Sequence, residues 1–446
     1  MKSLLNFFVK TGKLKQAERK GWLLYGVKNP ATSADHIFRA TILAWALNKE
    51  KKLDEKKLLK SILIHHLPDI FLGEQTPYDS LLPKDILLKE NRKAIDILLQ
   101  KLSQVSGVAQ KKTEIERKKQ EEKVLKRLVF RLPEDIKKEV FDLWSETGKR
   151  RTKLAKFSWE VGKIESYLQA LEYRKTDSKI KEINWTKWMK KNLKDPLISK
   201  LRKEIDGLFL KNKKKCEKGK MCDILNFIIQ VGKLKRLGRT GWILAGVKNP
   251  ETVAQHTFQM AFLAWFLGGI KGLDTDRIVK IALVHDLCEV YAGDQTPYDP
   301  VLATGIKDVK KLVSKPPRVP YTQRLEWLME KLNTEWKALS KLTSDLPKEL
   351  REEMVNLWID FEEGLTKEGR FVYQVDQVVN LVQAIEYWKK DKSFPITPWW
   401  ITIKEKIDDP VLLKFIATID REFSFINNKN KKAQEKKRTT KAKAKK

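Results

Sequence analysis

The segment Gly21-Trp-Leu-Leu-Tyr-Gly-Val-Lys-Asn-Pro30 returns later in the chain as Gly241-Trp-Ile-Leu-Ala-Gly-Val-Lys-Asn-Pro250. The offset along the chain that relates these two copies also relates His36 to His256. Further along, a slightly shorter offset pairs Gln169-Ala-Leu-Glu-Tyr173 with Gln383-Ala-Ile-Glu-Tyr387. Matches that keep their order over about 200 residues indicate that one domain has been duplicated.

The duplication predicts a division of the 446 residues into two domains. Domains of this size can each bury a core of their own. The boundary is expected in a Lys-rich linker, and the basic C-terminal tail lacks apolar periodicity and is expected to be disordered. We therefore expect a first domain at 1–210, a linker at 211–220, a second domain at 221–427 and a tail at 428–446.

Apolar residues within each copy recur at the spacing of an α-helix. Residues 372–388 show the pattern, with apolar side chains three and four positions apart, whereas strand-like alternation bounded by turns is scarce. The apolar positions in this stretch are Val375, Val378, Val379, Val382, Ile385 and Tyr387. We predict an all-α fold of two tandem helical bundles.

Composition and charge limit the class of protein. Hydrophobic residues make up 41% of the chain and charged residues 33%, which is typical of a folded protein with a charged surface. Three cysteines cannot build a disulfide framework, so a reducing, cytoplasmic location is expected. No apolar run reaches the length of about 18 residues that a membrane span needs. The net charge of +33 would attract polyanions, so a nucleic acid is a possible partner of the basic tail.

The five histidines are concentrated at matched positions of the two copies. His36, His65 and His66 lie in the first copy, and His256 and His285 lie in the second. Histidine is the commonest metal ligand and carries protons near neutral pH, so this concentration favours a functional role. The alternative is a pair of core histidines that the duplication copied.

The neighbours of the histidines in the second copy favour the functional interpretation. If residues 282–289 form one helix, His285 and Glu289 are one turn apart and share a face, with Asp286 beside them. The surrounding residues are apolar, and an unpaired carboxylate buried among them would cost several kcal/mol unless a cation or hydrogen bonds compensate it. The pattern therefore predicts a cluster of polar groups that converge on one site.

Taken together, the motifs of residues 223–425 resemble those of HD-domain metal-dependent phosphohydrolases. Within that family they are most similar to the 5′-deoxynucleotidase branch, which acts on deoxynucleoside monophosphates. The matching segments are Arg239-Thr-Gly-Trp242, Asn249-Pro-Glu-Thr-Val-Ala-Gln-His256, Val284-His-Asp-Leu-Cys-Glu289, Gly293-Asp294 and Phe371-Val-Tyr-Gln-Val-Asp376-Gln377.

The resemblance implies a metal site in the second copy. By it, His256, His285, Asp286 and Asp376 hold one divalent cation. Mixed His and carboxylate ligation suits Mn²⁺ or Co²⁺, with Mg²⁺ or Zn²⁺ as further candidates. Such a cation would activate a water molecule and neutralise charge on the phosphorus.

The same resemblance implies roles for four further residues. Glu289 is expected to act as the general base, and Asp294 to contact the sugar or a second cation. Arg239 matches the phosphate clamp, for which a planar guanidinium is well shaped. Trp242 is expected to bound the nucleoside pocket, with core packing as its alternative role.

The first copy departs from this pattern at the metal-facing positions. His66 stands where the second copy has Asp286, and Gly162 stands where it has Asp376. In addition, Pro68 is expected to interrupt the helix that should carry the base. We therefore predict that the first copy is catalytically silent and plays a structural or regulatory role, pairing with the second copy as a second subunit would. Because Arg19 and Trp22 are retained, nucleotide binding without hydrolysis stays open.

The predicted function is removal of the 5′-phosphate of (deoxy)nucleoside monophosphates by the second domain. One alternative is a non-catalytic nucleotide- or nucleic-acid-binding regulator that uses the basic surface and tail. Another keeps the enzyme but gives it a phosphodiester or triphosphate substrate.

A longer stretch of the second copy, residues 307–343, is expected to be a lid or a spacer.

Overall fold

A computed structural model of the chain describes residues 1–74, 107–177, 185–211, 216, 219–303, 309–314 and 319–424. Regular structure in these residues is helical, and extended pairing among them is limited to two isolated bridges, Glu18 with Thr32 and Gly238 with Thr252. The predicted all-α fold is confirmed. None of the helices in this part of the chain combines the length and apolar character that a membrane span requires.

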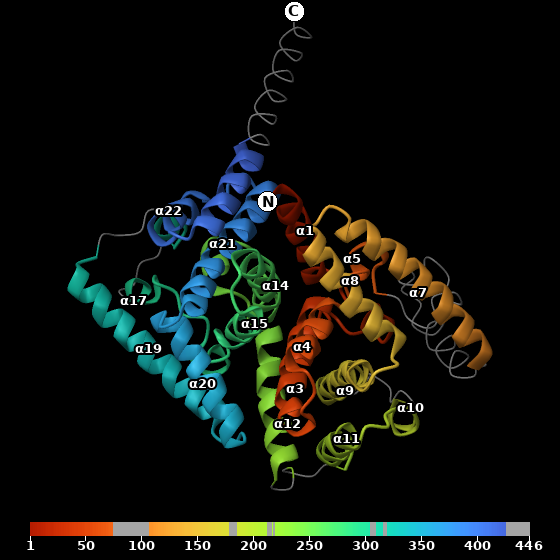
Figure 1. Ribbon diagram of the computed structural model, residues 1–446. Helices are drawn as coiled ribbons and strands as arrows, with labels where there is room; N and C mark the ends of the chain where they lie inside the picture. Colours follow the sequence, from red (N-terminus) through yellow and green to blue (C-terminus); the bar gives the residue numbers. More distant parts are fainter. Residues whose placement is uncertain are drawn as a thin grey trace, which may run out of the picture.

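The first half of the chain forms the helices on the right of Figure 1. They are α1 (Lys2–Thr11), η1 (Gly12–Lys15), α2 (Lys20–Leu24), α3 (Ser33–Lys51), α4 (Glu55–Ile64), α5 (Asp69–Leu72), α7 (Gly107–Val129), α8 (Glu134–Lys149), α9 (Lys153–Thr176), α10 (Trp185–Asn192) and α11 (Pro196–Phe209).

The second half begins with α12, which lies alongside α3 in Figure 1 and packs against it. Its helices are α12 (Lys220–Val231), η2 (Gly232–Lys235), α13 (Thr240–Leu244), α14 (Val253–Lys271), α15 (Thr275–Val284), α16 (Glu289–Ala292), α17 (Asp299–Leu302), α18 (Val309–Ser314), α19 (Tyr321–Thr343), α20 (Lys348–Glu363), α21 (Lys367–Lys390) and α22 (Thr397–Lys406), followed by a helix at residues 410–424.

The helices of the two halves correspond at the two offsets seen in the sequence. The offset that relates Gly21 to Gly241 carries the bounds of α3, α4 and α5 onto those of α14, α15 and α16. The shorter offset that relates Gln169 to Gln383 does the same for α7, α8 and α9 with α19, α20 and α21. The tandem repeat is therefore present in the helices as well as in the residues.

Local sequence signals set the start of the two central helices. Thr32 and Asp35 form a capping box at the start of α3, and Thr252 and Gln255 form one at the start of α14. In such a box two side chains satisfy backbone N–H groups that the first helical turn leaves free. The caps place His36 and His256 in the first turn of their helices.

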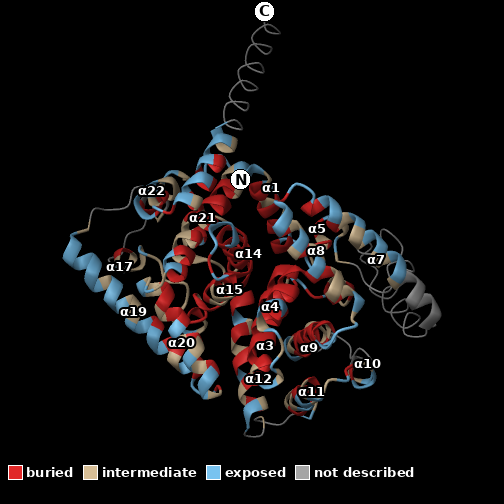
Figure 2. Ribbon diagram, in the orientation of Figure 1, coloured by how far each residue is buried: buried red, intermediate tan, exposed pale blue. Residues whose placement is uncertain are grey.

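Most of the buried apolar residues of the two halves form one continuous core. Figure 2 shows the buried positions concentrated on α3, α4, α14 and α15, whereas α19 exposes much of its surface. Helix α3 packs against α14, α1 packs against α14, and α12 packs against α3. The expected pairing of the copies did not include a shared core, because the apolar periodicity of a helix does not show which partner covers it.

Polar contacts across the interface are repeated in both directions. The Trp45 indole N–H donates to Glu353 in the second half at 3.1 Å, and the Trp265 indole N–H donates to Glu139 in the first half at the same distance. Each contact joins equivalent residues, which is the pattern of a two-fold symmetric dimer interface.

Some of the predicted segments lie outside the described residues. The whole tail at 428–446 and most of the linker at 211–220 lie outside them. The domain bounds therefore stay predictions. Of the stretch at 307–343, the described part is largely helix α19, which packs against α16 and α20.

Candidate active site

Four side chains from three parts of the second half meet at one point. His256 comes from the first turn of α14, His285 and Asp286 follow the end of α15, and Asp376 lies in the middle of α21. One ligand atom from each of His256, His285 and Asp286 lies within 4.8 Å of the others. Asp376 joins them, with its Oδ1 at 2.9 Å from His256 Nε2.

The prediction that His285 and Glu289 share one helix is wrong. Helix α15 ends at Val284, and α16 begins at Glu289. The residues between them form turns, because the backbone N–H of Leu287 donates to Val284 and that of Glu289 donates to Asp286. These bonds span three residues instead of four and interrupt the α-helical pattern.

The nitrogen and oxygen atoms at this point suit a bound cation. His285 Nε2 lies 2.9 Å from Asp286 Oδ2, the same separation as between His256 and Asp376. Both Nε2 atoms are buried, and neither makes a well-aligned hydrogen bond within the described part of the chain. Ligands about 2.1 Å from a shared ion lie roughly 3 Å apart when they are adjacent. The donor set therefore fits a divalent metal of the kind that the sequence predicts.

Neighbouring groups orient these ligands. The Nδ1 atom of His285 lies 2.8 Å from the Ala282 carbonyl, which directs Nε2 toward Asp286. Asp376 accepts hydrogen bonds from the side-chain amides of Gln377 at 2.8 Å and Asn380 at 3.1 Å. Such contacts to ligating residues are typical of metal sites.

Arg239 reaches into the same site from the start of α13. Its guanidinium lies 2.6 Å from Asp286, 3.6 Å from Asp294 and 3.9 Å from Glu289. Burial lowers the pKa of Arg239, but Asp294 and Asp286 outweigh it and hold that pKa well above its usual value. Arg239 is thus a fixed positive charge beside a carboxylate-rich pocket.

Glu289 and Asp294 lie near the same guanidinium nitrogen of Arg239 as Asp286 does. Burial, together with the charges of Asp286 and Asp294, raises the pKa of Glu289 well above its ordinary value. Its Oε2 atom is buried without a hydrogen-bond partner in the described part of the chain. Asp294 accepts a hydrogen bond from the backbone N–H of Thr240, which ties the loop after α16 to the start of α13.

Trp242 packs away from these groups, in the role given above as its alternative. Its side chain is buried, stacks on Trp399 with ring centroids 4.9 Å apart, and contacts Tyr387 edge-on. Its indole N–H donates to Glu251 at 3.2 Å. This geometry favours core packing over contact with a nucleoside, because the ring has almost no free surface.

Sequence reasoning assigned no role to Glu251, which the structure places behind His256. Glu251 Oε1 lies 3.8 Å from His256 Nδ1, and its Oε2 accepts a hydrogen bond from Lys15 of the first half at 2.6 Å. The only signal was its place in the motif before His256. Its partner is 236 residues away, which no local pattern reveals.

A charged cluster from α19 and α20 was also missed. Lys331 and Glu335 form an ion pair at 3.4 Å, and Glu335 is buried. Burial and the charge of Glu335 raise the pKa of Glu362 to about 7. Asp286 and Asp376 add to this effect, so the cluster belongs to the electrostatic surroundings of the metal-binding residues.

The first half presents different groups at the equivalent positions. His66 replaces Asp286, and Gly162 replaces Asp376, as the sequence indicates. Burial lowers the pKa of His36 to about 3 and holds the pKa values of His65 and His66 well below their ordinary range. All three rings are therefore neutral near neutral pH.

The expectation that Pro68 interrupts a helix is wrong. Pro68 caps α5, and the second half has the same break before α16, where Cys288 takes the equivalent position. A proline at the start of a helix removes no helical hydrogen bond. The break is thus a feature of both halves.

Comparison with known proteins decides the family. The model of a family described as "HD domain" matches residues 11–113, 105–201 and 231–397, which together exceed half of the chain. The chain belongs to the HD-domain family. The resemblance predicted from the sequence is confirmed, and matches in both halves of this HD protein agree with its tandem helices.

Curated relatives point to the same class. The HD protein is 31% identical over 202 residues to a human 5′-deoxynucleotidase, HDDC2. The aligned region covers 45% of this chain and 86% of that relative. It is 33% identical over 177 residues to the HDDC2 5′-deoxynucleotidase of Dictyostelium discoideum, covering 38% of the chain and 80% of the relative. The chain is a hydrolase of the HD phosphohydrolase type, as predicted.

A solved structure also matches the HD protein. A conserved hypothetical protein from Pyrococcus furiosus is similar at 25% identity and a TM-score of 0.33, over 44% of this chain and 99% of that one.

Proposed function

We propose that the second half of the chain hydrolyses the 5′-phosphate of deoxynucleoside monophosphates and that the first half does not. The observation that carries the proposal is the meeting of two histidines, four carboxylates and one arginine at a single buried site of the second half. The names of the relatives support the substrate class.

In this proposal His256, His285, Asp286 and Asp376 hold the cation. Two imidazoles and two carboxylates suit Mn²⁺ or Co²⁺, with Mg²⁺ and Zn²⁺ as further candidates. When bound, the cation supplies positive charge at the phosphate and makes water a better nucleophile.

The remaining residues act on the phosphate and on the water. Arg239 binds phosphate oxygens, for which its planar fork of donors is well suited. Glu289 accepts the proton of the attacking water, whose oxygen bonds to phosphorus as the bond to the 5′-oxygen breaks, and this proton then passes to the leaving 5′-oxygen. Asp294, held by the Thr240 N–H, faces the sugar of the substrate or a second cation.

The first half takes the place of a second subunit. Its contacts with the second half are reciprocal, as in a symmetric dimer. It also delivers Lys15 to Glu251, behind the metal-binding His256. The absence of Asp286 and Asp376 equivalents agrees with a structural or regulatory role.

Phosphate release from nucleoside mono-, di- and triphosphates, measured on the full chain with each candidate cation, tests the function. We expect deoxynucleoside monophosphates to be the substrates. Asp286→Ala or Asp376→Ala should abolish release, because each removes a charged ligand. Glu289→Ala should lower turnover while the metal content, measured by mass spectrometry, is unchanged.

A matched pair of variants tests the division between the halves. Arg239→Gln and Arg19→Gln each remove a guanidinium that lies 2.6 Å from a carboxylate, Asp286 and Glu74 respectively. We expect Arg239→Gln to lower turnover by about 10²-fold or more and Arg19→Gln to keep wild-type turnover. Equal losses in both variants, or release that persists in Asp286→Ala, would refute the proposal. Salt-sensitive nucleic-acid binding without any phosphate release would favour the regulator instead.

A further inference from the structure

Three histidines of the first half converge although two of the expected metal ligands are absent there. His36 lies in the first turn of α3, and His65 and His66 follow the end of α4. One ring nitrogen from each lies within 4.8 Å of the other two. The ring centroids of His65 and His66 are 4.0 Å apart, and that of His36 is 5.6 Å and 5.2 Å from them.

Each of these rings has its Nδ1 atom engaged. His36 Nδ1 contacts the Glu165 carboxylate, His65 Nδ1 lies 2.5 Å from the Ile62 carbonyl, and His66 Nδ1 lies 2.6 Å from Asp69 Oδ2. A neutral ring that donates from Nδ1 carries its lone pair on Nε2. Metal-ligating histidines show this arrangement, in which a carboxylate or carbonyl holds the second nitrogen.

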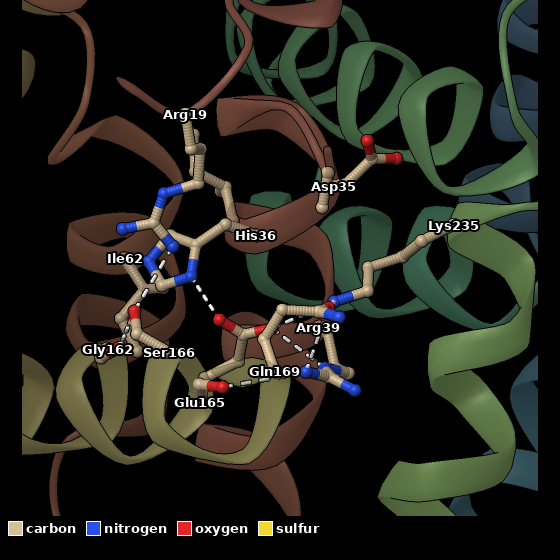
Figure 3. Close-up of polar contacts among 12 residues, drawn as sticks. Arg19, Asp35, His36, Arg39, Ile62, Gly162, Glu165, Ser166, Gln169 and Lys235 are labelled. Carbon is tan, nitrogen blue, oxygen red and sulfur yellow. Dashed lines mark hydrogen bonds and ion pairs between the residues drawn. The ribbon is translucent and has the colours of Figure 1, made fainter. Parts of the chain in front are cut away.

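The carboxylate behind His36 is itself firmly held. Figure 3 shows Glu165 between His36 and Arg39, with Lys235 of the second half reaching toward it. Glu165 accepts from Arg39 Nε at 2.8 Å and from Lys235 Nζ at 3.1 Å, and it is buried. These cations keep Glu165 an acceptor, which fixes the orientation of the His36 ring.

The Nε2 atoms of His36 and His65 lie next to the backbone of Gly162 in α9. A Cβ atom placed on Gly162 would lie 3.8 Å from His36 Nε2 and 3.9 Å from His65 Nε2. The equivalent residue of α21 is Asp376, whose carboxylate fills this position in the second half. Glycine supplies no ligand at this position, and Ser166 on α9 donates to the Gly162 carbonyl and accepts from Arg19.

We propose that His36, His65 and His66 bind one divalent cation through their Nε2 atoms, beside Gly162. Three imidazoles and no carboxylate favour Zn²⁺, Co²⁺, Ni²⁺ or Cu²⁺ over Mg²⁺ and Mn²⁺, which prefer oxygen ligands. The chain then carries two metal sites of different preference, and the site of the first half is independent of phosphate hydrolysis in the second.

Metal stoichiometry of the full chain tests this site. Metal-free protein is titrated with Co²⁺ and, separately, with Mn²⁺, and bound metal is measured after dialysis by mass spectrometry together with the visible absorption of Co²⁺. We expect two Co²⁺ per chain but one Mn²⁺. His66→Asn should lower bound Co²⁺ to one and leave Mn²⁺ binding intact. The matched variant Asp286→Asn should lose Mn²⁺ and keep the Co²⁺ of the first half.

The proposal would be overturned if Asp286→Asn bound no Co²⁺, or if His66→Asn bound as much Co²⁺ as the wild type. If His66→Asn does not fold, X-ray absorption of Zn²⁺ added to the Mn²⁺-loaded wild type decides the question. A shell with three imidazole nitrogens supports the site, and a shell dominated by carboxylate oxygens refutes it. None of these measurements depends on phosphate release, so failure of the proposed function would leave them interpretable.

Discussion

Two residue positions account for most of the chemical difference between the halves. Asp286 and Asp376 bring negative charge to the second site, whereas His66 and Gly162 bring none to the first. These exchanges could be predicted from the sequence, because the aligned repeats place them directly opposite each other. The convergence of His66 on His36 and His65 could not, since spacing along the chain does not set the direction of a side chain.

Glu362 provides a prediction about pH at the same scale. Burial and Glu335 raise its pKa to about 7 in the folded chain, above the usual 4.5. Its contribution to stability is therefore fully present below pH 4.5 and is lost as the pH rises through 7. We expect Glu362→Gln to gain about 3 kcal/mol over the wild type between pH 4.5 and pH 8. Urea unfolding of the metal-free protein across this range measures the difference.

The neighbouring Glu363, which is exposed on the same helix, supplies the control. Glu363→Gln makes the same chemical change at an exposed position of the same helix and should alter the free energy of unfolding by less than about 0.5 kcal/mol. A gain for Glu362→Gln that is the same at pH 4.5 and pH 8 would contradict the prediction.

At the scale of the elements, helix type and helix starts followed from local signals. Capping residues such as Thr252 and Thr366 mark the starts of α14 and α21. The end of α15 at Val284 was not predicted, because the apolar pattern runs through the turn into α16 without a Gly or Pro to mark the break. Because the helix ends here, the Asp286 side chain lies beside His256 and His285.

The packing of α21 on α20 yields a second prediction. A Cβ atom on Gly369 would lie 2.2 Å from the carbonyl oxygen of Asp360, too close for either backbone to accommodate. Gly369→Ala should therefore separate the two helices and lower the free energy of unfolding by about 1–3 kcal/mol. Because Asp376 lies farther along α21, metal affinity should fall as well. Urea unfolding and Mn²⁺ titration measure the two effects.

The first half offers the reverse substitution at the same position. Ala155 of α9 is equivalent to Gly369 and is already accommodated in a buried position. Ala155→Gly should cost only about 1 kcal/mol, the usual effect of glycine within a helix. Wild-type stability of Gly369→Ala would show that the helices tolerate the added methyl group.

At the scale of the whole molecule, each half contributes a buried lysine that pairs with a carboxylate of the other half. Lys15 of the first half pairs with Glu251 of the second, and Lys235 of the second half pairs with Glu165 of the first. Each carboxylate lies behind a histidine of its own half, His256 or His36. Each half thus places a buried lysine beside the carboxylate that lies behind a histidine of the other half.

Removal of Lys15 tests this pairing. Both members of the Lys15–Glu251 pair are only 3% exposed, so Lys15→Met leaves a buried carboxylate without its cation. We expect a loss of about 3–5 kcal/mol in the free energy of unfolding. Lys2→Met, which breaks an exposed pair with Glu422, should change it by less than about 0.5 kcal/mol. Similar losses in the two variants would argue against a buried link between the halves.

The sequence by itself determined the duplication, the helical class and the residue types at the metal-binding positions, because apolar spacing, caps and repeats are local properties of the chain. Only the tertiary structure decided that the two halves share one core, that Trp242 is packed in a smaller apolar cluster of the second half, and that Lys15 and Lys235 cross between the halves. These features depend on contacts between residues that are distant in sequence, such as Lys15 and Glu251, 236 residues apart. Burial alone makes such contacts strong, and burial is a property of the assembled fold.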